Sequence, residues 1–205
     1  AKRWRWLLTF VVLAMLTKEQ VGLSVCAFGL YAWFVQKQRR WGLLLTFLPI
    51  IWSLTMLLVV VPHFRPETIG GNQVYQTAFG NGAGSIAQAI ITKPWDVATE
   101  LISKQNVIYG WQLFAGSGII GIASPWWLAA LPDLVINGLS LKPSQHVIIA
   151  HYASMIAPWI LLSTMVTTAW VLRKSEKYRW KRFAPALVVV WLIGWSAYAV
   201  YTTSP

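Results

Sequence analysis

Long apolar runs separated by short polar turns make up most of the chain. A helix needs about 20 apolar residues to cross the hydrocarbon core of a bilayer, so three of these runs are long enough to span and four are shorter. The seven runs cover residues 6–16, 21–35, 41–61, 108–122, 126–139, 147–172 and 183–201. The pattern therefore predicts an all-α, polytopic integral membrane protein. It should contain about five to seven apolar helices, including short paired half-helices.

The one long polar stretch, residues 63–107, divides these runs into two groups. It contains Gly-rich segments, and the segment 80–84 reads as flexible loop rather than as a phosphate cradle, because no Lys-Ser or Lys-Thr pair follows it. Two helical pieces are expected within the stretch, at residues 85–91 and 95–102. The second should start near Pro94, with Asp96 in its first turn. We expect a single membrane domain over residues 1–205, which has three apolar helices in 6–62, an extracytoplasmic loop at 63–107 and four apolar helices in 108–205.

Composition agrees with this class of protein. Hydrophobic residues make up 57% of the chain and charged residues only 11%, whereas a soluble domain carries about 25% charged residues. The 14 Trp residues suit a membrane interface. The net charge of +11 sits in short clusters between apolar runs, so we expect membrane lipids and no nucleic acid as partners. Cys26 is the single cysteine, which excludes an intrachain disulfide and a cysteine metal site.

Three basic clusters, at residues 2–5, 37–40 and 173–182, set the expected topology. The positive-inside rule predicts that all three face the cytoplasm. The first hairpin must then turn at Lys18 and Glu19, and the region 108–139 must turn near Ser124 and Pro125. The first segment lacks the small-residue cleavage site of a signal peptide, so we interpret it as a mature membrane segment.

Ionisable residues gather on the predicted outer face, and the pair Lys18-Glu19 is the leading candidate site. An ionisable pair at the membrane boundary is costly, which makes it a functional candidate. In one interpretation the two residues only cap a turn at headgroup level. In the other, Lys18 binds a lipid phosphate, and Glu19 orients it or binds a polar headgroup. Arg65 is a further candidate for lipid-phosphate binding on this face.

His151 and Tyr152 open an apolar run and are also candidates. They fit an interfacial Tyr beside a His bonded to a carbonyl. They also fit a phosphate contact, a proton donor or an axial ligand to a pigment or haem. Asp133, Asn137 and His146 are expected as polar support on the same face, with Asp133 either the N-cap of a helix or a partner for Lys18. The three histidines lack metal-binding spacing, and no metal site is expected.

Several motifs resemble one family of bacterial membrane proteins. These motifs are residues 16–23, 28–31, 39–43, 124–125, 131–140 and 151–158. Together they cover most of the chain, and they are similar to the family of domain of unknown function 2079, in its C-terminal part. That family is in turn similar to the GT-C membrane glycosyltransferases, which transfer a sugar from a polyprenyl-phosphate donor at the outer face. In related transferases a base near this position meets the donor phosphate, and that role would fall on Lys18.

The resemblance implies a GT-C-like protein of the bacterial inner membrane, or the C-terminal half of one, that binds a polyprenyl-phosphate-linked sugar. GT-C enzymes place a key acidic residue in their first outer loop, and no residue before Lys18 supplies it, so no catalytic residue is assigned and enzymatic activity is left open. No cofactor is identified. The alternative is a non-catalytic accessory subunit of a larger respiratory or photosynthetic membrane complex, and pigment binding belongs to this alternative alone. A transporter is less favoured, since no predicted span carries an ionisable residue near its middle.

Overall fold

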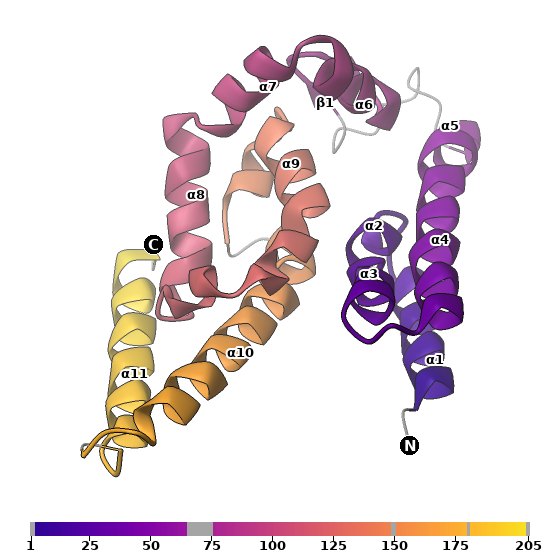
Figure 1. Ribbon diagram of the computed structural model, residues 1–205. Coiled ribbons are helices and arrows are strands. Elements are labelled where there is room, and N and C mark those ends of the chain that lie inside the picture. The colour runs from indigo at the N-terminus through magenta and orange to yellow at the C-terminus, as the bar shows by residue number, and fades with distance from the viewer. Residues whose placement is uncertain (1–2, 65–75, 149–150, 180, 204–205) are drawn as a thin grey trace. The chain divides into compact units, whose positions relative to one another are not determined.

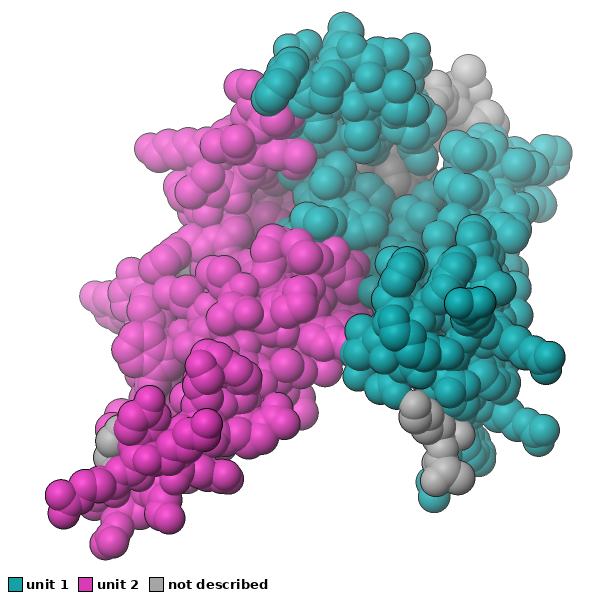
Figure 2. Space-filling model, viewed as in Figure 1, with its two compact units in different colours: residues 1–97, 131–142 teal, residues 98–130, 143–205 magenta. Residues whose placement is uncertain are grey.

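The computed structural model describes residues 3–64, 76–148, 151–179 and 181–203, and most of them are helical (Figure 1). The chain divides into two compact units, which are coloured separately in Figure 2. Unit 1 comprises residues 1–97 and 131–142, and unit 2 comprises residues 98–130 and 143–205. Each unit is described by itself below.

Unit 1 begins with three short apolar helices and one long helix. These are α1 (Trp4–Met15), α2 (Val21–Val25), α3 (Ala27–Phe34) and the continuous helix formed by α4 (Arg39–Thr55), the π-helical turn η1 (Met56–Val60) and α5 (Val61–Phe64). Pro62 lacks the N–H that an α-helix would need at that position. The π turn lies just before this missing donor, as a single turn inserted in a long α-helix.

Helices α2 and α3 pack closely on α4 because both carry glycine at the contact. A Cβ on Gly22 would lie 2.5 Å from Ser53 Oγ and 2.9 Å from the carbonyl carbon of Pro49. A Cβ on Gly29 would lie 2.5 Å from the carbonyl carbon of Leu45. Real Cβ atoms do not approach backbone this closely, so both positions require glycine. Such small-residue contacts are the usual way in which helices approach closely in membranes.

The rest of unit 1 follows the long helix. It contains the antiparallel pair β1 (Gln76–Thr77) and β2 (Gly80–Asn81), helix α6 (Ala83–Thr92), the start of α7 (Pro94–Leu101), and α9 (Leu131–Leu139). An isolated bridge joins Thr77 to Ser140, just after α9, and the Leu141 N–H donates to the Gln76 carbonyl at 2.8 Å. These bonds tie the short hairpin to the end of α9.

Unit 2 contains two long helices and several short turns. Its elements are the end of α7, α8 (Lys104–Ala115), the 3₁₀ turns η3 (Ile120–Ala123), η4 (Pro125–Ala130), η5 (Pro143–His146) and η6 (His151–Met155), and the helices α10 (Ala157–Ser175) and α11 (Ala184–Thr203). Helix α10 packs on η3, where Gly121 faces the Thr164 side chain and the Ile160 carbonyl. Helix α11 packs on α8, and the Trp191 indole N–H donates to the Gly118 carbonyl at 2.8 Å just beyond α8.

Two helices are long and apolar enough to cross a membrane, Arg39–Phe64 and Ala184–Thr202. Of the three predicted spans, 41–61 lies within the first of these helices, and 183–201 overlaps the second except for residue 183. The third predicted span, 147–172, is not among the candidate spans, because its regular helix α10 begins only at Ala157. The shorter apolar helices include Trp4–Met15 and Val21–Phe34, which correspond to the first two predicted half-helices.

Four predicted elements differ in their bounds. The helical pieces expected at 85–91 and 95–102 correspond to α6 and α7, and Pro94 and Asp96 are in the first turn of α7 as expected. Helix α8 begins at Lys104, inside the stretch predicted as loop. The pattern missed this start because the first three residues of the helix, Lys-Gln-Asn, are polar and do not belong to an apolar run. The run 147–172 becomes regular α-helix only at Ala157, after the 3₁₀ turn η6.

Candidate functional site

The turn between α1 and α2 carries Lys18 and Glu19, as the hydrophobic pattern predicts. Both side chains are half-buried. The Lys18 carbonyl accepts a hydrogen bond from the Val21 N–H at 3.2 Å, which closes the chain into the start of α2. The pair therefore sits on a defined turn between two apolar helices.

Asp133 of α9 is the buried carboxyl group at the centre of this part of unit 1. Its side chain is only 1% exposed. One carboxylate oxygen accepts a hydrogen bond from the Gln20 side-chain amide at 2.6 Å, and the other accepts one from the Ser24 hydroxyl at 2.5 Å. A typical hydrogen bond within a protein contributes about 0.5–1.5 kcal/mol, so the two bonds link α9 to α2 and to the residue just before it.

The interpretation of Asp133 as a helix N-cap is wrong. Helix α9 begins at Leu131, so Asp133 lies inside its first turn rather than before it. The carboxylate does not bond to the N-terminal backbone of its own helix but to two side chains more than 100 residues earlier. The other interpretation, a partner for Lys18, agrees with the Coulombic interaction between these two residues.

Burial raises the pKa of Asp133 above its ordinary value, because removal from water disfavours the charged carboxylate. The hydrogen bonds from Ser24 and Gln20 and the positive charge of Lys18 lower the pKa, and they offset only part of the effect of burial. Helix α9 lies outside the two candidate membrane spans. The group can therefore exchange its proton at a pH above that of an ordinary aspartate.

Polar side chains continue along α9 from this carboxylate. Asn137 follows Asp133 by four residues, so both lie on the same helix face, and Asn137 is also 1% exposed. Ser140 ends the helix, and its N–H donates to the Asn137 carbonyl at 3.2 Å. Both side chains are buried, and their expected role as polar support on the outer face stays a prediction.

The other predicted site residues belong elsewhere. Arg65 and the side chain of His151 lie outside the part of the chain that the structure describes. Tyr152 is in unit 2 and is 6% exposed, so its ring is buried. His146 is also in unit 2, where its ring meets Tyr109 edge-on at 6.4 Å between centroids. Their participation with Lys18 and Glu19 in one site stays a prediction.

Gln20 and Ser24 are the site residues that sequence reasoning missed. Both side chains are 2% exposed. Their neighbours in the sequence are charged or apolar and do not mark the two residues as buried. They are four residues apart, which places them on one face of a helix, and that spacing is the only signal the sequence carries. Nothing local indicated that their partner would be Asp133.

The cluster joins the ammonium group of Lys18 to the buried carboxyl group of Asp133. A lysine ammonium has three donors and can bond a phosphate while it remains near a carboxylate. Among the described residues, no group of three or more His, Cys, Asp or Glu side chains is placed to hold a metal ion.

Comparison with known proteins places the chain in a family. No curated protein and no solved structure matches it. Residues 1–202 match the family described as predicted membrane protein DUF2079. Nearly the whole chain is included in that match, and the two long apolar helices agree with the description. The chain therefore belongs to the DUF2079 family of membrane proteins.

Proposed function

We propose that this chain is a GT-C-like protein of the bacterial cytoplasmic membrane that binds a polyprenyl phosphate, the carrier of a lipid-linked sugar, at the turn formed by Lys18 and Glu19. The three basic clusters would face the cytoplasm, and the Lys18–Glu19 turn would face the opposite side of the membrane. Lys18 would bond the phosphate. Glu19 would orient it, and Arg65, His151 and Tyr152 would contribute on the same face. We assign no catalytic residue.

The observation that carries the proposal is the position of the Lys18 charge beside a buried, hydrogen-bonded carboxylate. Lys18 stands at the end of two apolar helices, where the phosphate of a membrane-embedded lipid would be found. Asp133 fixes α2 through Gln20 and Ser24, and so it holds the turn that presents Lys18. A preorganised cation loses less entropy when it binds than a freely moving side chain does.

The test uses the full chain in lipid nanodiscs with two probes, farnesyl phosphate and farnesol, which differ only by the phosphate. We expect the natural protein to bind the phosphate more tightly than the alcohol. Lys18→Gln should weaken phosphate binding by about tenfold or more, since it removes a hydrogen bond from a charged donor. Farnesol binding should change little.

Lys93→Gln provides the matched control, because Lys93 is exposed at the end of α6. It should bind both probes as the natural protein does. Equal affinity of the natural protein and Lys18→Gln for farnesyl phosphate would contradict the proposal.

One observation favours the alternative, a non-catalytic accessory subunit of a larger membrane complex. Helix α1 exposes Trp6, Phe10 and Leu13, each more than half accessible, on a single face. Their spacing of four and three residues makes a continuous apolar stripe. In this case mild detergent should release the chain as part of a large assembly of several subunits. Substitution of Phe10 by Glu should detach it, whereas Lys18→Gln should not.

A further inference from the structure

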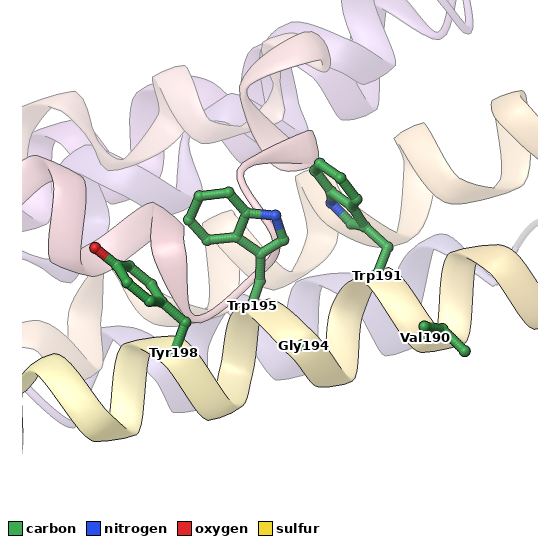
Figure 3. A pocket seen from close by; sticks show the side chains of 5 residues that line it. All are labelled: Val190, Trp191, Gly194, Trp195 and Tyr198. Carbon is green, nitrogen blue, oxygen red and sulfur yellow. The ribbon is translucent and has the colours of Figure 1, made fainter.

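An aromatic groove runs along one side of α11 in unit 2. Figure 3 shows Trp191, Trp195 and Tyr198 rising from the same side of the helix around Gly194. With Val190 they line a cavity of about 410 Å³. Gly194 forms its floor, and a Cβ added there would meet nothing within 4 Å. The groove exists because a residue without a side chain lies among three large rings.

The rings that frame the groove are held in place by one another. The Trp195 ring meets Tyr198 edge-on at 5.5 Å, meets Trp111 of α8 edge-on at 5.6 Å, and lies 5.8 Å from Trp191. The Trp191 N–H is already bonded to the Gly118 carbonyl. The groove is thus preformed and mainly apolar, so it suits a hydrocarbon occupant.

Its depth agrees with that occupant. Helix α11 is a candidate membrane span from Ala184 to Thr202. Val190 is six residues into this helix, which is about 9 Å at a rise of about 1.5 Å per residue. The groove therefore begins about 9 Å from the end of the span that follows the basic loop, and continues toward the other end. In a bilayer that depth holds lipid chains.

The loop before α11 supplies charge of the sign that attracts an anionic headgroup. Residues 173–182 include six basic residues and one acidic residue, Glu176. Lys177, Arg179, Lys181 and Arg182 are exposed. Each Lys or Arg close to an anionic membrane surface strengthens binding by about fivefold. The basic residues that would attract a headgroup therefore come first along the chain, and the apolar groove of α11 follows. The headgroup and acyl chains of a phospholipid have the same order.

We propose that the loop and the groove together bind one anionic phospholipid, with its headgroup at Lys181 and Arg182 and one acyl chain beside Gly194. The ligand belongs to the leaflet that faces the basic loop. This site uses only residues of unit 2, and it does not depend on the proposed function of Lys18.

The test is native mass spectrometry of the full chain after reconstitution in bilayers of equal phosphatidylglycerol and phosphatidylcholine. The natural protein should retain one lipid, mainly phosphatidylglycerol. A Cβ at position 194 would meet no atom within 4 Å, so Gly194→Leu should place its side chain in the groove and abolish retention. The double variant Lys181→Gln, Arg182→Gln should retain less lipid, with the preference for phosphatidylglycerol reduced by about fivefold for each cation removed.

Two control variants separate the site from general effects. Val189→Leu changes an exposed residue of the same helix that does not line the groove, and it should retain lipid normally. Lys37→Gln, Arg39→Gln removes two cations from another basic cluster and should keep the phosphatidylglycerol preference. The proposal is overturned if the natural protein retains no lipid, retains both lipids equally, or retains lipid unchanged in Gly194→Leu. It is also overturned if α11 instead cross-links to a second protein through the groove.

Discussion

Adding one methyl group at Gly29 should separate α3 from α4. The new Cβ would overlap the backbone nitrogen and hydroxyl of Thr46 and would lie 2.5 Å from the carbonyl carbon of Leu45. Carbon atoms in contact prefer about 3.5–4.0 Å, so the two helices must move apart by about 1 Å or more. Two of these three atoms belong to the backbone of a long helix, so no side-chain rotation can relieve the overlap.

The free-energy cost of Gly29→Ala can be measured by comparison with the same substitution at a glycine that has no close neighbours. Overpacking of this kind costs about 1–3 kcal/mol. Alanine also gains about 1 kcal/mol of helix propensity over glycine, which partly conceals the strain. Gly110 of α8 has nothing within 4 Å of its Cβ position, so Gly110→Ala receives only the gain. The difference in unfolding free energy between the two variants isolates the strain, and it should be about 1–3 kcal/mol.

The assay is the thermal midpoint of the detergent-solubilised chain, followed by far-ultraviolet circular dichroism. For a chain of about this size, 1 kcal/mol corresponds to about 2–4 °C. Gly29→Ala should therefore unfold roughly 2–12 °C below Gly110→Ala. Equal midpoints would refute the close helix approach.

Further predictions concern α2 and its contact with α9. Gly22→Ala should behave as Gly29→Ala does, because its Cβ would meet the backbone of Pro49 and the Ser53 hydroxyl, and the same midpoint measurement applies. Ser24→Ala should lower the unfolding free energy by about 1–3 kcal/mol in a denaturant titration near neutral pH, because it removes a donor from a buried carboxylate. Burial raises the pKa of Asp133, so the folded protein holds this proton to a higher pH than the unfolded chain does. The contribution of protonated Asp133 to the unfolding free energy should be complete below the ordinary pKa of aspartate. It should be lost as pH rises through the raised pKa of the folded protein. Midpoints measured across pH 4–8 should show this fall, and Asp133→Asn should remove it.

The hydrophobic pattern predicts the long helices because their evidence is local. The helix 39–64 and α11 each contain a continuous apolar run, and α7 carries Pro94 at its start. Length and composition decide these elements without reference to the rest of the chain. The α8 start at Lys104 was missed because the segment is too polar for an apolar-run criterion.

The contacts of the candidate site were not predictable in the same way. The sequence showed that Lys18 and Asp133 are ionisable residues next to or within apolar runs. It left open that the two are partners. It gave no reason to bring Gln20 and Ser24 to Asp133, because hydrogen-bond partners 113 and 109 residues apart leave no periodic signal. The glycine contacts could have been suspected, since Gly22 and Gly29 are seven residues apart, about two helical turns, and so face the same way along an apolar run.

Helix α2 shows why these two kinds of contact are needed together. Five residues form little more than one turn, and a helix of that length is not stable by its own hydrogen bonds. Its position must come from its neighbours. On one side Gly22 lets it lie against the backbone of α4, and on another Ser24, with Gln20 just before the helix, bonds to Asp133 of α9. The Lys18–Glu19 turn precedes this helix directly, so loss of either contact should displace Lys18. Defects in phosphate binding should therefore accompany Gly22→Ala as well as Ser24→Ala, although neither residue carries a charge.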